Sequence, residues 1–234
     1  MTSIPRSLAA DPRVGETHYF FDSSFPVGYF SHSFGFETKV AEYSKVGFDA
    51  CKSWILNYVV FSIWYSELEA MEHAQLGYRP CDAAARESIE AIDHLLFVSR
   101  STKDARRGSQ LIAGATKRAA VIFLGEESGE LLSYNLKEPA VVIGVIAAIR
   151  SWNMATTRLL YMQSHALALS QVLLRYAKIG QNDQILLMAE LLPTIGELAL
   201  RRPRSTSATF GKTCMEIDMD QMRHETLTPR LFQS

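Results

Sequence analysis

The stretch Val145–Ile179, VIAAIRSWNMATTRLLYMQSHALALSQVLLRYAKI, decides the fold because it contains neither glycine nor proline. A strand rarely exceeds about ten residues, so a tract of this length predicts a helix. Its charged residues are few, namely Arg150, Arg158, Arg175 and Lys178, which favours a position at the centre of a bundle. An apolar stripe at helical spacing supports this, formed by Val145, Ile149, Trp152, Thr156, Leu159, Met162, Ala166, Leu169, Leu173 and Tyr176.

Other helices are predicted on both sides of this tract. Phe48–Leu76 and Asp82–Arg107 also lack glycine and proline, and Leu111–Leu124 has helical character. Gln181–Leu200 is a further helix, in which Pro193 is expected to kink or split the chain. Since no convincing alternating strand is present, the sequence predicts an all-α, single-domain helical bundle of about seven to nine helices.

The organisation along the chain follows from composition. We expect a flexible N-terminal segment at 1–18 and an all-helical domain at 19–200. The polar run RRPRSTS predicts a mobile loop at 201–213. A C-terminal helix and tail follow at 214–234, where charged and aromatic residues continue to the last position. Because an idle tail is usually small and polar, this one is interpreted as a partner-binding tail.

Overall composition excludes several classes of protein. Of 234 residues, 47% are hydrophobic, and the formal net charge of -1 removes the usual basis for nucleic-acid binding. Three cysteines, Cys51, Cys81 and Cys214, show no Cys-x-x-Cys spacing and fit a reducing compartment. The longest apolar run, Ala140–Ile149, is about half of a bilayer span. We therefore expect a cytoplasmic protein that binds neither nucleic acid nor membrane.

Two short stretches resemble catalytic motifs, but each lacks a residue that its motif requires. Gly211-Lys212-Thr213 resembles a phosphate-binding loop, yet Thr206 stands where that loop needs its first glycine. His224-Glu225 begins like a zinc-protease motif, yet Thr228 replaces the second histidine. No Gly-x-Ser-x-Gly elbow occurs, although Ser/His/Asp and Cys/His arrangements made by folding stay open. The sequence thus predicts no enzyme activity and no cofactor.

Histidines and basic residues allow two interpretations each. Glu69 with His73 and Glu90 with His94 have i,i+4 spacing, which is typical of a solvated helix face rather than a di-iron site. His165 is interpreted as a hydrogen-bonded core histidine, with a ligand role as the alternative. A group of basic residues is assigned to a solvated helix face, with docking of a charged partner as the alternative: Arg100, Lys103, Arg106, Arg107, Lys117 and Arg118.

Two unusual segments stand near the ends of the chain. Phe25–Glu37 reads FPVGYFSHSFGFE, in which Pro26 fixes one turn and Gly28 frees the next. Ser31 or Ser33 can cap a following helix, and Glu37 would lie near its positive end. Met222–Ser234 reads MRHETLTPRLFQS and resembles a segment that becomes ordered on a partner.

Together these segments resemble the urease accessory protein F family, UreF. Pro26–Glu37 is similar to Pro-Val-Gly-Gly-Phe-Ser-Tyr-Ser-x-Gly-Leu-Glu, with Tyr29, His32 and Phe36 substituted. Met222–Glu225 and Pro229–Leu231 are similar to Met-Arg-His-Glu followed by Ser-Arg-Leu. Two further matches fall between them in family order. Pro139–Gly144 is similar to the family segment Pro-Val-x-Phe-Gly. Leu174-Arg175 and Gly180-Gln181 are together similar to a basic residue followed by Pro-Leu-Gly-Gln. Tyr29, Lys178 and Thr228-Pro229 depart from the pattern, which bears on the turn geometry and the tail contact.

The resemblance implies a non-enzymatic, all-helical component of nickel insertion into urease. It implies a homodimer that binds the scaffold protein UreD or UreH and recruits the GTPase UreG. The complex then delivers Ni2+ to apo-urease in a GTP-dependent step, so Ni2+ and GTP are handled by the complex, with no cofactor in this chain. The alternatives are a helical, nickel-handling protein, with transient contacts to His224, Cys214 or His32, and a helical regulator with a small-molecule pocket.

Site residues follow from the matched motifs. The expected partner-binding residues are Glu37, Arg175, Gln181, Met222, Arg223, His224, Glu225, Arg230, Leu231 and Phe232. The expected structural positions are Pro26, Gly28, Ser31, Ser33, Gly35, Gly144 and Gly180. Arg230 is the strongest single prediction, because a guanidinium can form a bidentate pair with a partner. For Glu37 and Arg175 a structural ion pair or a helix cap is the alternative, and no residue is predicted as a catalytic group or metal ligand.

Overall fold

The computed structural model describes residues 11–27, 32–43, 46–176, 178–202 and 215–228, and all regular structure within these ranges is helical. The all-α prediction is confirmed. The elements, in chain order, are α1 Pro12–Phe20, α2 Phe36–Glu42, α3 Phe48–Asn57, the π-helical η3 Tyr58–Glu67, α4 Leu68–Gly77, α5 Ala83–Ser99, α6 Lys103–Leu124, the 3-10 turn η4 Gly125–Glu127, α7 Ser128–Leu132, α8 Pro139–Ile149, α9 Met154–Arg175, α10 Gln181–Leu200 and α11 Met215–His224.

Two long tracts predicted as single helices are each divided by an N-cap. The Thr102 side chain accepts a hydrogen bond from the Ala105 backbone and starts α6, which separates it from α5. The Asn153 side chain accepts one from the Thr156 backbone and starts α9, which separates it from α8. The prediction of one helix through Val145–Ile179 is therefore wrong, because a cap residue satisfies the free backbone N–H groups of a new helix start.

Two other boundaries also differ from expectation. Helix α1 begins at Pro12, so helical structure starts before residue 19, the boundary that was expected. The side chain of Asp11 accepts a hydrogen bond from the Arg13 backbone, and the proline at the first helical position fits there because its missing N–H has no partner to lose. A kink or a split was expected at Pro193; helix α10 contains Pro193 and runs from Gln181 to Leu200, so the helix is not split.

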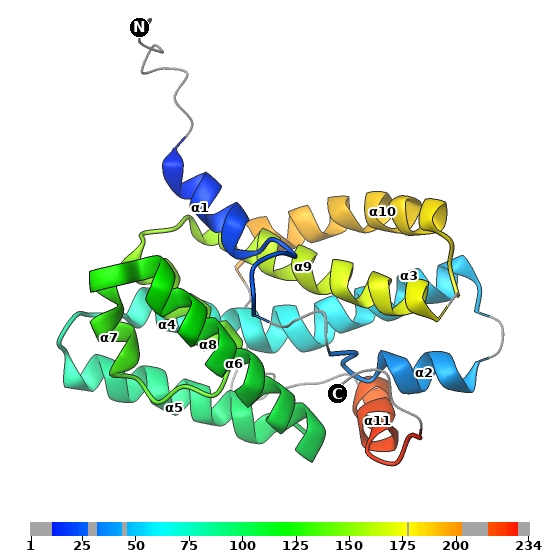
Figure 1. Cartoon of the computed structure of the whole chain (residues 1–234), viewed down its shortest axis with the longest axis horizontal. Helices are drawn as coiled ribbons and strands as arrows, with labels where there is room; N and C mark the ends of the chain where they lie inside the picture. The colour runs from blue at the N-terminus through cyan, green and yellow to red at the C-terminus, as the bar shows by residue number, and fades with distance from the viewer. Residues whose placement is uncertain (1–10, 28–31, 44–45, 177, 203–214, 229–234) are drawn as a thin grey trace, which may run out of the picture.

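Helix α9 lies at the centre of the structure, as predicted from its low charge. It packs against α10, α1, α2, α3 and η3, and Figure 1 shows it between α10 and the α3 side of the bundle. Most of its length is buried, including Tyr161, Met162 and Leu169. On the opposite side of the molecule α4 packs against α8, with α5, α6 and α7 around them.

Gly144 fixes how closely α8 approaches α4. A Cβ atom at this position would lie 2.4 Å from the Met71 carbonyl oxygen and 2.8 Å from the Ala74 Cβ. Both distances are shorter than van der Waals contact, so the two backbones meet at a distance that only glycine permits. Gly144 is thus a packing residue, in agreement with its predicted structural role.

A buried polar network joins the end of α5, the start of α8, η3 and α9. The Arg100 guanidinium lies 2.6 Å from the Glu138 carboxylate and 3.0 Å from that of Glu67. The Tyr161 hydroxyl donates to the other Glu67 oxygen at 2.6 Å. Arg100 therefore does not belong to a solvated basic face, which corrects the interpretation of that residue.

Candidate functional site

The segments near the two ends of the sequence meet in the structure, where α11 packs against α2. Gly35 precedes α2 with a φ of 86°, a left-handed conformation that glycine adopts easily. A Cβ at Gly35 would lie 2.9 Å from the Gln221 Cγ and 3.1 Å from the Gln221 backbone nitrogen. Gly35 therefore allows α11 to approach the start of α2, and Figure 1 shows the two helices side by side.

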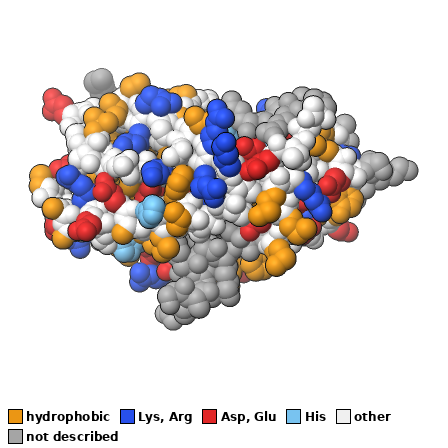
Figure 2. Space-filling view, turned by 90° about the horizontal axis from the view of Figure 1, so that it is seen from below, with side chains coloured by type: hydrophobic (Ala, Val, Ile, Leu, Met, Phe, Trp, Pro, Cys, Tyr) orange, Lys and Arg blue, Asp and Glu red, His pale blue; other side chains and the backbone are white. Residues whose placement is uncertain are grey.

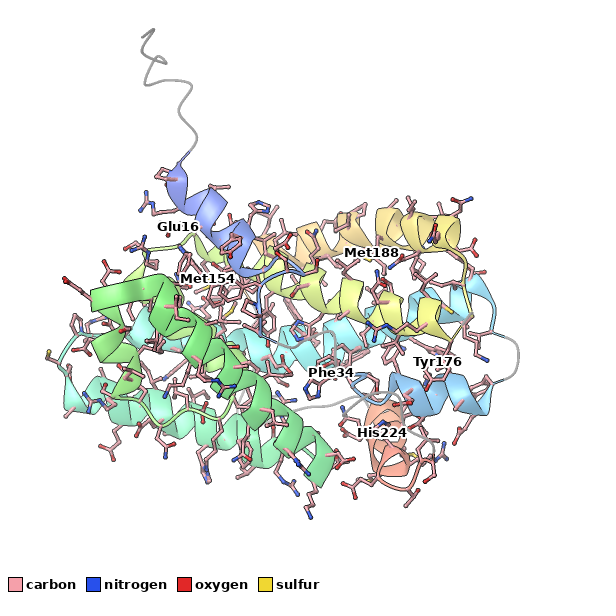
Figure 3. All side chains as sticks on the ribbon, viewed as in Figure 1. Glu16, Phe34, Met154, Tyr176, Met188 and His224 are labelled. Carbon is pink, nitrogen blue, oxygen red and sulfur yellow. The ribbon has the colours of Figure 1, made fainter. Side chains whose placement is uncertain are left out.

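Glu37 is the centre of the contact between these segments. Its carboxylate accepts a hydrogen bond from the hydroxyl of Tyr176, which directly follows α9, and another from His224 Nε2 of α11 at 2.9 Å. The Glu37 and His224 side chains are 0% and 1% exposed. Burial, followed by the bond to Glu37, raises the pKa of Tyr176, so the phenol stays protonated and donates. One buried carboxylate thus connects α2, α9 and α11, and Figure 3 shows Tyr176 and His224 near α2.

A second pair of contacts supports the same junction. The buried Lys39 ammonium of α2 pairs with Asp220 at 3.1 Å and with Glu216, both on α11. The pKa of Asp220 is raised overall, because the effect of burial exceeds the opposite effect of the Lys39 charge. On the exposed side, Arg223 lies 3.1 Å from Glu42. We call α2, α11 and the contacts Glu37–His224 and Lys39–Asp220 the α2–α11 clasp.

The last motif residue before the tail connects α11 to a third element. The Glu225 carboxylate accepts hydrogen bonds from the backbone nitrogens of Lys103 at 2.9 Å and Asp104 at 3.4 Å. These nitrogens belong to the first turn of α6, where free N–H groups and the helix dipole favour an anion. The motif Met222–Glu225 therefore holds α11 against both α2 and α6.

The imidazole of His224 also lines a pocket. His224 Nδ1 is buried and has no hydrogen-bond partner within the described residues, and an Asp104 carboxylate oxygen lies 3.6 Å from it. The pocket between α6, α11 and the start of α2 is lined by these two side chains and by Phe34, Glu67, Thr102 and Gln221, among others. Figure 3 labels Phe34 near the start of α2 and His224 on α11.

The predicted partner-binding residues divide into buried and exposed groups. Glu37 and His224 are buried and contact each other within the clasp, which fits the structural alternative given for Glu37, while their predicted contact with a partner stays a prediction. The exposed residues are Arg175, Gln181, Met222, Arg223 and Glu225. Arg230, Leu231 and Phe232 lie outside the described residues.

The predicted structural positions are also accounted for. Gly35 and Gly144 permit close backbone approach, and Gly180 caps α10, with its N–H donating to the Asp183 carboxylate at 3.0 Å. Ser33 is buried before α2, whereas Pro26 is exposed. Gly28 and Ser31 lie outside the described residues.

Sequence reasoning did not pick out Lys39 or Asp220, and it placed Tyr176 only in an apolar helical stripe. Lys39 and Asp220 are separated by 181 positions, and neither belongs to a recognisable spacing. The Glu216/Asp220 pair at i,i+4 spacing is the one local hint, because it places two carboxylates on one face of α11.

Two other histidines, His165 and His32, are buried in the protein interior. His165 Nδ1 donates to the Tyr161 carbonyl at 2.8 Å, and burial lowers its pKa, so the interpretation as a core histidine is confirmed. Burial lowers the pKa of His32 to about 4. Among the described residues, no group of three or more His, Cys, Asp or Glu side chains is placed to hold a metal ion.

The surface offers both charges and exposed apolar side chains. On the face drawn in Figure 2, Lys and Arg side chains are interspersed with Asp and Glu. On α11, Met215, Met219 and Met222 are exposed at i, i+4 and i+7 spacing. None of the helices formed by the described residues has the length and apolarity to cross a bilayer.

Comparisons with known proteins point to one family. A family model described as UreF matches residues 49–192. A relative from Bacillus sp. (strain TB-90), described as "Urease accessory protein UreF", is 28% identical over 91% of this chain and 95% of its own length. Relatives with the same description from Geobacillus kaustophilus and Rhizobium meliloti are 26% and 27% identical, over 91% and 90% of this chain.

Proposed function

Because the chain belongs to the UreF family of urease accessory proteins, we propose that it is a non-enzymatic adaptor of urease maturation. In this role it joins the UreD/UreH scaffold to the GTPase UreG and supports GTP-dependent insertion of Ni2+ into apo-urease. It works in the cytoplasm as a homodimer and carries no cofactor of its own. Binding is its whole contribution, so its effect on the GTPase depends on binding one state more tightly than another.

The observation that carries the proposal is the α2–α11 clasp. Glu37, His224 and Lys39 are buried, so their contacts set the position of α11 without occupying the surface. Neighbouring Met222 and Arg223 stay exposed on the same helix. An adaptor needs such a surface, in which buried contacts fix the backbone and exposed side chains are available to a partner.

The remaining predicted partner residues extend this surface. Arg175 is exposed at the last position of α9, one residue before Tyr176, which contacts Glu37. Gln181 is exposed at the first position of α10. We propose that these two residues and the exposed side of α11 belong to one partner-binding surface, with Arg230, Leu231 and Phe232 of the tail as further contacts.

The test of the function is complementation. The chain is co-expressed with a urease operon that lacks its F component, and urea hydrolysis and nickel content of the purified urease are measured. The proposal predicts recovery of both. Urease that stays nickel-free, while the chain is soluble and folded, would show that the chain does not perform this role.

The test of the tail uses Arg230. Replacing Arg230 by Ala removes the five donors of a guanidinium, so activation is expected to be lost with little change in melting temperature. Arg79→Ala is the matched control, since Arg79 is exposed and donates to backbone carbonyls near the end of α4. Full activation by Arg230→Ala, or equal losses in the two variants, would contradict the assignment.

A further inference from the structure

The outer face of α6 carries basic side chains in one line. Lys103, Arg107 and Arg118 are exposed, and their spacings of four and eleven residues place them on the same side of the helix. The opposite side is buried, and α6 packs there against α8. Figure 1 shows α6 at the front of the molecule. We call Lys103, Arg107 and Arg118 the α6 stripe.

The cations of the α6 stripe have no carboxylate partner among the described residues. None of their charged groups lies within 4.0 Å of an Asp or Glu oxygen there. Other exposed arginines do have such partners, since Arg202 pairs with Glu72 and Arg223 with Glu42. The positive charge of the stripe is therefore not balanced by a neighbouring carboxylate, and an anionic group from outside the chain can approach it.

Gly114 sets the spacing of the two guanidinium groups. A Cβ at Gly114 would lie 3.3 Å from Arg118 Nη1, so the Arg118 side chain lies back over the helix at this glycine. Gly114 stands seven residues after Arg107, which is about 10 Å along the helix axis. Two carboxylates with a similar separation can each form a bidentate pair with one guanidinium.

Exposed aliphatic side chains border the stripe. Leu111 is 49% exposed and Ile122 is 86% exposed. They follow Arg107 and Arg118 by four residues each, so both lie along the same edge of the stripe. Protein interfaces are enriched in arginine and bury apolar side chains beside it. Contacts with phosphate groups alone would leave these aliphatic side chains uncovered, so the combination favours a protein as the partner.

The charge reverses where α6 ends. Glu126 and Glu127 follow in η4, and both are exposed. A nucleic acid or an anionic membrane carries negative charge throughout and would be repelled at this end. A protein can change the sign of its own charge at the matching place, and such complementarity fixes its direction along the helix.

We propose that the α6 stripe, together with Leu111 and Ile122, docks an acidic segment of a partner protein. The segment has carboxylates opposite the two arginines and apolar side chains opposite the two aliphatic residues. This surface lies on α6 rather than on α11, so it adds a second docking site to the adaptor surface proposed above. It stands whether or not the chain acts in urease maturation.

The first experiment uses a defined acidic probe. A fluorescent, stapled helical peptide with Glu at i, i+4 and i+11 and Leu beside them is titrated with the full chain, and anisotropy is measured. The reference peptide has the same composition, with its Glu residues spread around the helix. The aligned peptide should bind one-to-one and about tenfold more tightly, with weaker binding at high salt. Equal affinity for the two peptides would overturn the proposal.

The second experiment removes the two guanidinium groups. The double variant Arg107→Gln/Arg118→Gln is expected to bind the aligned peptide about tenfold more weakly, with slower association and a smaller salt dependence. The matched control, Arg79→Gln/Arg201→Gln, removes equal charge from exposed positions near the ends of α4 and α10. It should bind as the unchanged chain does, and equal losses in the two double variants would refute the docking site.

Folding of these variants is checked by circular dichroism. If the double variant does not fold, Arg107→Gln alone takes its place, with an expected loss of about threefold. No loss in that variant would contradict the proposal.

The third experiment separates a protein partner from other anions. Ile122→Ser should speed dissociation of the aligned peptide and leave its salt dependence unchanged, because the apolar contact is lost and the charges remain. An unchanged dissociation rate would contradict the apolar part of the site. A DNA duplex or phosphatidylserine vesicles are also titrated. Binding of either one that depends on Arg107 and Arg118 would assign the stripe to that partner and overturn the proposal.

Discussion

The contact between α8 and α4 makes a quantitative prediction for Gly144. Replacing Gly144 by Ala places a Cβ 2.4 Å from the Met71 carbonyl oxygen, which belongs to the backbone and cannot rotate away. Overpacking of a core costs about 1–3 kcal/mol, and a backbone clash belongs at the upper end. The helix itself gains about 0.8–1.0 kcal/mol when Gly becomes Ala. A net loss of about 2 kcal/mol in the free energy of unfolding is expected.

Gly196 of α10 provides the matched control. A Cβ at Gly196 meets no atom within 4 Å, so Gly196→Ala has the helical gain without the clash. It should raise the free energy of unfolding by about 0.8–1.0 kcal/mol. The two substitutions are chemically identical, so the difference between them, about 3 kcal/mol, measures the contact with Met71.

The assay is urea-induced unfolding followed by far-ultraviolet circular dichroism and tryptophan fluorescence. Coincident transitions from the two probes would justify a two-state analysis. The Gly144→Ala midpoint should fall and the Gly196→Ala midpoint should rise, with equal slopes. A Gly144→Ala variant that is as stable as the unchanged chain would refute the close approach of α8 to α4.

Three further predictions concern the clasp and the buried carboxylates. Gly35→Ala should separate α11 from α2, because its Cβ would meet Gln221, and limited proteolysis should then cleave α11 faster while most of the helical signal remains. Tyr176→Phe removes one hydrogen bond to Glu37 and should lower the free energy of unfolding by about 1 kcal/mol, measured in urea. Burial raises the pKa of Asp93 from 3.8 to about 6, so its folded state holds the proton more tightly than the unfolded chain. The protonated Asp93 side chain therefore contributes its full stabilisation below about pH 4, and this contribution is lost as the pH rises through 6. Between pH 4 and 7 the free energy of unfolding of the unchanged chain, relative to that of Asp93→Asn, should fall by at most about 3 kcal/mol.

The helical architecture was predictable because its signals are local. Long tracts without Gly or Pro become helices, and the low charge of α9 indicates burial on several sides. The breaks at Thr102 and Asn153 were missed because apolar periodicity continues on both sides of each cap. A single side-chain oxygen that accepts a backbone hydrogen bond was enough to start a new helix there.

The composition of the site was predictable only in part. Motif resemblance picked out Glu37 and His224, but not the fact that they touch across a sequence separation of 187. Nothing in the local pattern of either residue specifies burial, and both were expected at a partner surface. Lys39 and Asp220 lacked even a motif, since a long-range ion pair leaves no periodic trace in the sequence.

The contacts of the clasp change how a loss of urease activation should be interpreted. A substitution at Glu37 or His224 removes a buried hydrogen bond and displaces α11, so it weakens partner binding through the fold. A substitution at Arg223 acts from the surface, where its ion pair with Glu42 is half exposed and contributes little stability. Variants at Arg223 that keep full stability and still lose activation would therefore locate the partner surface, whereas the same loss at Glu37 would report only that α11 must be held in place.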